Sequence, residues 1–120
     1  MSSILIVDDE KSLRGFLVIM LEEEGYQVVT SPSVEKAIKL IRENSFDLVL
    51  TDIRMGRSNG IDVLDAARKI LPDTPVVMMT AYASAETAVT AMKKGAYDYI
   101  SKPFKIEDLQ LIVKNALEKR

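Results

Sequence analysis

Five residues whose side chains can bind metal ions or react with phosphorus stand at the ends of short apolar runs. Asp8 and Asp9 follow the first run, Asp52 follows the third, Thr80 ends the fourth and Lys102 follows the fifth. A carboxylate nucleophile, a divalent cation, a lysine and a hydroxyl form a set suited to phosphoryl transfer, because that chemistry depends on positioning and on neutralising charge. The set predicts phosphoryl transfer if the fold brings these run ends together.

Three of these residues are aspartates, and carboxylates held close together repel one another strongly. Either some of them are protonated or a cation holds them together. An all-oxygen cluster near a phosphoryl group suits Mg²⁺, which keeps several of its waters. Asp52 stands alone after an apolar run and is the best candidate for a nucleophile that forms an aspartyl phosphate. The Asp8–Asp9 pair is better placed to hold the metal.

Each of these residues also has an ordinary structural explanation. The acidic stretch 8–10 could cap the helix that follows it, since acidic residues favour helix N-termini. Asp52 could be a loop residue, Thr80 a strand end and Lys102 part of a turn. Four such placements at one edge of a sheet are not expected by coincidence, so the joint pattern favours the functional interpretation.

Short apolar runs alternate with longer amphipathic segments along the chain. The runs are rich in Val and Ile, as expected of strands buried on both faces. They lie at Ile4–Val7, Val28–Val29, Leu48–Leu50, Val76–Met79 and Tyr99–Ile100. Between them, apolar residues recur with the period of a helix and give each segment one apolar stripe. The stripes cover Leu13–Leu21, Val34–Ile41, Gly60–Leu71, Ala85–Met92 and Leu109–Leu117.

Five strand–helix pairs in succession predict one α/β domain, a doubly wound five-stranded parallel sheet with five helices on its two faces. Five strands suit the flavodoxin-like order 2-1-3-4-5. The first, third, fourth and fifth strands are then neighbours, and ligands of such sheets bind outside the carboxyl ends of the strands. The fold therefore predicts that the polar run ends converge.

Small polar residues and glycines mark the expected ends of the helices. Gly25 and Gly95 follow helical segments and predict their C-termini. Ser33 and Ser84 precede helical segments and predict N-caps. These signals agree with the boundaries that the apolar periodicity indicates.

Composition excludes several classes of protein. With no cysteine and no histidine, the 120-residue chain offers no thiol nucleophile, disulfide, imidazole base or His-ligated zinc. Lys+Arg number 16 and Asp+Glu 18, and the net charge of −2 is too balanced for a binder of nucleic acid or anionic membranes. No run is long enough to span a membrane and no signal peptide is recognisable. We therefore expect a cytoplasmic protein.

Four stretches resemble the receiver domains of two-component response regulators, and the resemblance covers essentially the whole chain. The stretches are Ile4–Glu10, Asp47–Met55, Met79–Ala81 and Gly95–Phe104. The sequence from Thr80 to Val89 and again over 95–104 is most similar to the NtrC-like subfamily. Members of that subfamily usually carry a receiver, an AAA+ ATPase and a helix-turn-helix domain, and they activate transcription. The resemblance implies a CheY-like receiver domain over residues 1–120, the N-terminal part of a longer regulator.

The resemblance also implies a role for each residue of the site. Asp52 would be the phosphoacceptor, and Lys102 would pair with the phosphoryl oxygens, with a cis bond to Pro103. Asp9 would be a direct Mg²⁺ ligand and Asp8 would act largely through water.

Further roles follow from the same resemblance. The Asp52 carboxylate and the backbone carbonyl of Arg54 would complete the protein's metal ligands. Thr80 would swing to bond the phosphoryl group, and Tyr99 would be an aromatic switch that turns inward when Thr80 moves. Gly56 stands where receiver domains usually have proline, and glycine loosens the backbone there.

A receiver domain would take its phosphoryl group from the phosphohistidine of a sensor histidine kinase. Phosphorylation would then switch the face formed by the fourth helix, fifth strand and fifth helix, which would control the output domain and support a homodimer. A stripe of small residues on the fourth helix could serve that dimer or simply pack against the sheet; it comprises Ala83, Ala85, Ala88 and Ala91. Such a chain is a signalling domain that catalyses only its own phosphorylation and dephosphorylation.

Three other functions are compatible with parts of the pattern. A free-standing receiver would signal by docking to a partner protein. A phosphohydrolase of the haloacid-dehalogenase type would need a second Asp two residues after the nucleophile, where this chain has Arg54. A nucleotide or flavin module would need a Gly-rich first loop, whereas the stretch 8–10 is acidic and repels phosphate.

Overall fold

Five parallel strands form a central sheet in the order β2-β1-β3-β6-β7 in the computed structural model, which describes residues 1–55, 58–81 and 85–119. The strands of this sheet are β1 (Ser3–Val7), β2 (Gln27–Ser31), β3 (Leu48–Asp52), β6 (Val76–Thr80) and β7 (Asp98–Ser101). The helices are α1 (Lys11–Glu23), α2 (Val34–Glu43), α3 (Ile61–Ile70), α4 (Ala85–Lys93) and α5 (Ile106–Lys119). The predicted order 2-1-3-4-5 is confirmed.

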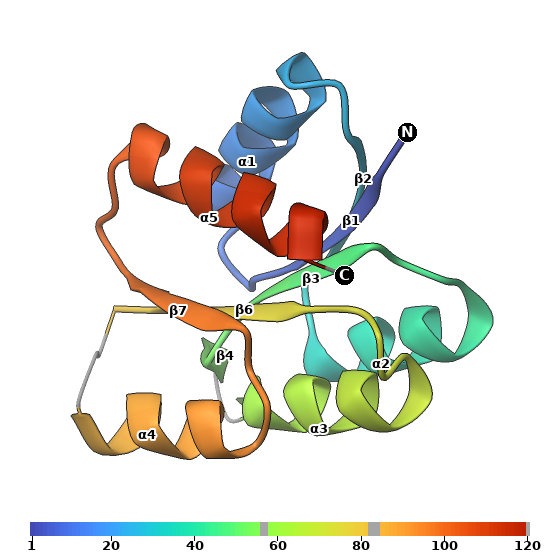
Figure 1. Ribbon diagram of the computed structural model, residues 1–120, viewed down its shortest axis with the longest axis vertical. Coiled ribbons are helices and arrows are strands. Elements are labelled where there is room, and N and C mark those ends of the chain that lie inside the picture. Colours follow the sequence, from blue (N-terminus) through green and yellow to red (C-terminus); the bar gives the residue numbers. More distant parts are fainter. Residues whose placement is uncertain (56–57, 82–84, 120) are drawn as a thin grey trace.

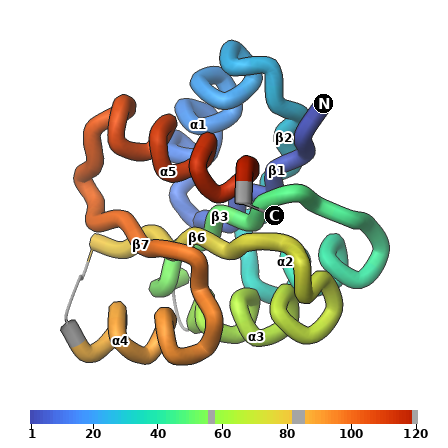
Figure 2. Tube along the Cα trace, in the orientation of Figure 1, coloured from blue at the N-terminus to red at the C-terminus, as the bar shows by residue number. Residues whose placement is uncertain are grey.

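The helices cover the sheet on both sides, as a doubly wound fold requires. Helices α1 and α5 lie on one face, and α2, α3 and α4 lie on the other (Figure 1). The trace in Figure 2 follows the chain from each strand through a helix to the next parallel strand. Within the described residues, no helix is both long and apolar enough to cross a membrane.

The core has two halves, one on each face of the sheet, because successive side chains of a strand point to opposite faces. Leu5 of β1 belongs to the half under α2 and α3, whereas its neighbours Ile4 and Ile6 belong to the half under α1 and α5. Every residue of β3 and of β6 is buried. These continuous apolar runs are what a parallel sheet covered on both faces demands.

Asp52 lies inside β3 rather than after it, which corrects the expected end of the third strand, whereas Thr80 ends β6 as predicted. Asp52 is the last residue of β3 and is paired in register with Met79, and Thr80 is the last residue of β6 and is paired with Ser101. The parallel ladder continues to these positions because the backbone hydrogen bonds do not depend on side-chain polarity. Both side chains are therefore held by regular backbone.

The segment after β3 forms a short antiparallel pair that the apolar pattern did not predict. Strands β4 (Arg54–Met55) and β5 (Ser58–Asn59) pair there, with Met55 buried. Gly56, the departure from the usual proline, lies outside the described residues.

The helix ends predicted from single residues agree with the structure where it describes them. Gly25 has a φ of 92° and Gly95 a φ of 99°, the left-handed conformation that favours glycine after a helix. Ser33 caps α2, and its hydroxyl accepts a hydrogen bond from the Lys36 amide. Ser84 lies outside the described residues.

Two predicted apolar stripes are turned relative to the core. Phe16 of α1 is 44% exposed and lines a surface groove with Leu13 and Phe104 instead of entering the core. In α4 the small residues Ala88 and Ala91 face the core, whereas Val89 and Met92 are about half exposed. Ala88 and Ala91 of the alanine stripe therefore pack inward, and larger apolar side chains form the outer face of α4; Ala83 and the side chain of Ala85 lie outside the part of the chain that the structure describes.

Candidate functional site

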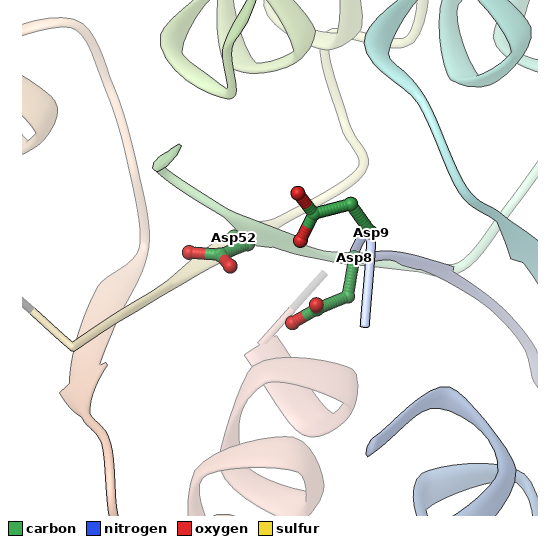
Figure 3. A group of neighbouring side chains, drawn as sticks. All are labelled: Asp8, Asp9 and Asp52. Atoms are coloured by element: carbon green, nitrogen blue, oxygen red, sulfur yellow. The ribbon is translucent and has the colours of Figure 1, made fainter. Parts of the chain in front are cut away.

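Lys102 joins two buried aspartates at the carboxyl edge of the sheet. Its Nζ lies 2.7 Å from Asp8 Oδ2 and 3.0 Å from Asp52 Oδ2. One carboxylate oxygen of Asp8, one of Asp9 and one of Asp52 all lie within 4.8 Å of one another. Figure 3 shows the three side chains reaching the same place from the ends of β1 and β3. The predicted convergence of these residues is confirmed.

Asp8 is fully buried and its polar atoms are bonded on all sides. Its amide donates to the Ser31 carbonyl, and Oδ1 accepts a hydrogen bond of 2.9 Å from the amide of Glu10. The other carboxylate oxygen accepts from Lys102, and the backbone carbonyl accepts from the Arg14 guanidinium at 2.7 Å. A buried charge needs such partners, so the loop between β1 and α1 is fixed around this carboxylate.

The structural alternative, in which this acidic stretch caps α1, does not hold. Glu10 occupies the N-cap position without a side-chain capping bond, and no acidic residue lies in the first turn of the helix. The Asp8 carboxylate binds the Glu10 amide and faces the sheet edge instead. The carboxylate of Asp8 therefore lies with Lys102 and Asp52 at the sheet edge and does not cap the helix.

Asp52 combines burial with a lysine partner. Burial raises the pKa of Asp52 above its usual 3.8, and the charge of Asp8 raises it further, while Lys102 and the Arg54 amide lower it without reversing the shift. The Arg54 amide lies 3.3 Å from Asp52 Oδ1, so the hydrogen bond that this oxygen accepts from it is long. Asp52 is thus a carboxylate whose negative charge is incompletely compensated.

Lys102 is held as a cation by the same cluster. Burial alone would lower the pKa of Lys102, but its hydrogen bonds to Asp8 and Asp52 and their charges raise it above the usual 10.5. The side chain of Lys102 is 16% exposed. A cation therefore stands beside Asp52 throughout the neutral pH range.

The donor set fits a small hard cation. Three carboxylates and one lysine leave an excess of negative charge when all are ionised, and the available donors are oxygens. Mg²⁺ prefers such donors and keeps several waters, so a few protein ligands suffice. Asp9 is exposed to solvent, whereas Asp8 and Asp52 are buried. The residues present therefore fit a divalent cation.

Thr80 and Tyr99, the two expected switch residues, lie in different environments. Thr80 is 2% exposed, and its carbonyl accepts a 2.7 Å hydrogen bond from the Lys102 amide. Tyr99 lies on the edge strand β7 and is 38% exposed, beside Val89 and Met92 of α4. The structure thus places Thr80 next to the cluster and Tyr99 on the outer face. The peptide bond between Lys102 and Pro103 is cis.

Two structural features of the site were not predicted from the sequence. Gly60 packs directly against the backbone carbonyl of Asp52, so that a Cβ at this position would collide with that oxygen. Arg14 reaches back from the first turn of α1 to the Asp8 carbonyl. The sequence carries only weak signals for these two contacts. Gly60 stands at the start of an apolar stripe, and Arg14 follows the acidic stretch by one helical turn.

Residues 4–114 match the family model described as the response regulator receiver domain. The chain belongs to this family. It is 44% identical over 114 residues to the transcriptional regulatory protein ZraR of Escherichia coli (strain K12), covering 95% of this chain and 26% of that protein. The regulatory protein AtoC of the same strain is 43% identical over 96% of this chain and 25% of its own length. The receiver is thus NtrC-like, and it spans about a quarter of the length of these curated relatives.

Solved receiver structures share the whole fold. A CheY-like receiver domain protein from Methanospirillum hungatei JF-1 has a TM-score of 0.95 at 34% identity, with 98% of this chain and 94% of that chain covered. The beryllofluoride-activated NtrC4 receiver domain, described as a dimer in solution, has a TM-score of 0.92 at 39% identity, with 98% of each chain covered. The receiver is therefore of the two-component signalling type.

Proposed function

We propose that this receiver takes a phosphoryl group from the phosphohistidine of a sensor histidine kinase onto Asp52. The observation that carries the proposal is Lys102, whose ammonium lies 3.0 Å from the Asp52 carboxylate inside a buried acidic cluster. A carboxylate with incompletely compensated charge can attack phosphorus, and a fixed cation beside it can neutralise the incoming oxygens. The chain itself has no histidine, so the phosphohistidine belongs to a partner.

In the proposed transfer, a bond forms between an Asp52 carboxylate oxygen and phosphorus, and the bond between phosphorus and the partner's imidazole nitrogen breaks. Lys102 pairs with a phosphoryl oxygen in place of one of its present aspartate contacts. Asp9, Asp52 and the Arg54 carbonyl would hold Mg²⁺, with Asp8 acting through water. Bound Mg²⁺ supplies positive charge that offsets the phosphoryl oxygens. Water later hydrolyses the acyl phosphate, which returns Asp52 to its carboxylate form.

A groove beside the cluster suits the docking of such a partner. It has a volume of about 410 Å³, and Lys102 belongs to its lining, which is otherwise mainly apolar: Leu13 and Phe16 of α1, Ala81 after β6, and Pro103 and Phe104 after β7. Phe16, which is not needed in the core, forms part of this lining. An apolar partner helix lying in the groove would bring its phosphohistidine toward Lys102.

The signal would leave the site through Thr80. Its hydroxyl sits at the end of β6 and can turn to a phosphoryl oxygen, and Tyr99 on the adjacent β7 can move into the space that this opens. The added charge biases such a two-state element. The affected surface is the face of α4, β7 and α5.

We also propose that this face forms a homodimer. Val89, Met92 and Tyr99 expose apolar surface beside Lys93, while Asp98 and Asp108 line the adjoining groove between β7 and α5. A twofold axis would place the basic side of one copy on the acidic side of the other. The similar NtrC4 receiver is described as a dimer in its activated form, which supports the same assembly here.

The output of the full protein would be transcriptional activation through an attached AAA+ ATPase and a DNA-binding domain. The support is that the similar relatives ZraR and AtoC are regulators about four times longer than the part matched by this receiver. In this proposal residues 1–120 are the receiver part, in the cytoplasm, without nucleic-acid or membrane contacts of their own. A free-standing receiver would signal through the same face by docking.

Transfer from a kinase tests the proposal. A phosphorylated histidine kinase domain is mixed with the receiver and Mg²⁺, and the product is reduced with borohydride, which converts an aspartyl phosphate to homoserine. Peptide mass mapping should then place homoserine at position 52. A modification at another residue, or none although the kinase loses its phosphoryl group to other receivers, would contradict the proposal.

A further inference from the structure

Asp9 is the exposed carboxylate of the acidic cluster, and in the described part of the chain no hydrogen bond or ion pair reaches its side chain. Asp8 and Asp52 are fixed by Lys102 and by backbone amides. The place of Asp9 is therefore set by the backbone alone, through the peptide unit that joins it to Asp8.

Arg14 holds that peptide unit. Its Nη1 lies 2.7 Å from the Asp8 carbonyl oxygen, a charge-assisted hydrogen bond. The Arg14 amide in turn donates to the Glu10 carbonyl at 3.1 Å, so the residue is anchored in the first turn of α1. The Asp8 carbonyl lies before the N-cap and outside the helix, and the guanidinium supplies its donor.

We propose that Arg14 is a positioning residue for the metal site, which orients the Asp8–Asp9 peptide so that the Asp9 carboxylate meets those of Asp8 and Asp52. This inference rests on the proposed Mg²⁺ site. Groups that orient ligands from outside commonly decide metal affinity, because the ion demands near-ideal geometry. Without Arg14, Asp9 keeps its carboxylate but loses the constraint that places it.

The direction of the effect separates positioning from simple electrostatics. Arg14 is a cation near three carboxylates, so removing its charge makes the site more negative and should by itself strengthen the binding of a divalent cation. Loss of positioning weakens that binding. A weaker site after removal of a positive charge is therefore the signature of the positioning role.

Calorimetric titration with MgCl₂ tests the proposal, using Arg14→Gln and a matched control, Arg68→Gln. Arg68 also donates from Nη1 to a backbone carbonyl at 2.7 Å, that of Pro72, and its substitution changes the net charge equally. We expect Arg14→Gln to raise the Kd for Mg²⁺ by about tenfold, the lower end of the range for groups that orient metal ligands without binding the metal. Arg68→Gln should leave the Kd unchanged.

A second measurement excludes a general loss of structure. With acetyl phosphate as donor, Arg14→Gln should need about tenfold more Mg²⁺ for half-maximal phosphorylation and should reach the wild-type rate at saturating Mg²⁺. Should this variant fail to fold in circular dichroism, Arg14→Lys, which keeps the charge and draws the donor back from the Asp8 oxygen, takes its place.

The outcomes are distinct. A folded Arg14 variant that binds Mg²⁺ as tightly as the wild type, or more tightly, overturns the inference and leaves the proposed function intact. Equal weakening in Arg14→Gln and Arg68→Gln also overturns it, since a change shared with the distant control would be a general effect on the stability of the domain. If the wild-type chain binds no Mg²⁺, the proposed function fails together with the inference.

Discussion

The ammonium of Lys102 lies 3.0 Å from the carboxylate of Asp52, although 50 residues separate them in the chain. The sheet topology creates this contact, because β3 and β7 flank β6 and deliver their carboxyl ends to one edge. The site consequently depends on the whole fold, and the residues that form it also affect the stability of the fold.

Substitution of Asp52 should stabilise the domain. Burial, with the charge of Asp8, holds the pKa of Asp52 above 3.8, so the folded state binds this proton more tightly than the unfolded state does. The stabilisation from this group is complete below about pH 3.8 and is lost as the pH rises through the folded-state pKa. Asp52→Asn, which cannot ionise, should therefore raise the free energy of unfolding at pH 7 by about 1 kcal/mol, a usual gain for a stabilising substitution.

Urea denaturation of wild type and Asp52→Asn between pH 3 and pH 8 measures this difference. The advantage of the variant should shrink toward the acid end of the range. A variant that is less stable than the wild type at pH 7, or an advantage that does not change with pH, would show that ionised Asp52 is well accommodated.

Removal of Lys102 should destabilise the domain strongly. Lys102→Ala leaves the fully buried Asp8 without its cation, and breaking a buried pair in this way costs about 3 kcal/mol. The matched control is Lys94→Ala, which breaks the pair with Asp65, whose side chains are 44% and 50% exposed. Such exposed pairs contribute about 1 kcal/mol or less. Comparable losses for the two variants in denaturation would argue against a buried, lysine-dependent cluster.

Gly60 should be intolerant of any side chain. A Cβ there would collide with the Asp52 carbonyl, and the Gly60 amide donates to the Ile53 carbonyl at 2.7 Å, so the backbone has little room to retreat. We expect Gly60→Ala to lose about 1–3 kcal/mol, as other overpacked positions do. Gly15→Ala in α1, where nothing lies within 4 Å, should instead gain about 0.5–1 kcal/mol from helix propensity.

Thermal unfolding of Gly60→Ala and Gly15→Ala measures the change in stability of each variant relative to the wild type. A Gly60→Ala protein as stable as the wild type would mean that the start of α3 can move away from Asp52. That result would show that the close contact of Gly60 with the Asp52 carbonyl is not needed to hold the site.

The proposed dimer predicts that a charge on its apolar face dissociates it. Met92 is 44% exposed on α4, and Met92→Glu would place a carboxylate in the interface. Sedimentation velocity after beryllofluoride treatment should show dimers for the wild type and monomers for this variant. Ile19→Glu, at an exposed apolar position of α1, is the control and should still dimerise. If both variants form dimers, the dimer interface does not include the exposed apolar face of α4.

The fold and the acidic cluster follow from local sequence patterns. Apolar runs with Val and Ile, alternating with helical stripes, are enough to predict the strand order, and Asp8, Asp9, Asp52 and Lys102 converge because of that order. What could not be predicted depends on packing between distant residues. The outward turn of Val89 and Met92 reflects the close approach of Ala88 and Ala91 to the core, and the Gly60 contact reflects the path of the chain after β3.

The intact mass of the protein after incubation with acetyl phosphate and Mg²⁺ tests the central claim most directly. The wild type should gain the mass of one phosphoryl group, and both Asp52→Asn and an EDTA-treated wild type should gain none. An adduct that persists in Asp52→Asn, or that forms equally well in EDTA, would contradict metal-dependent phosphorylation of Asp52.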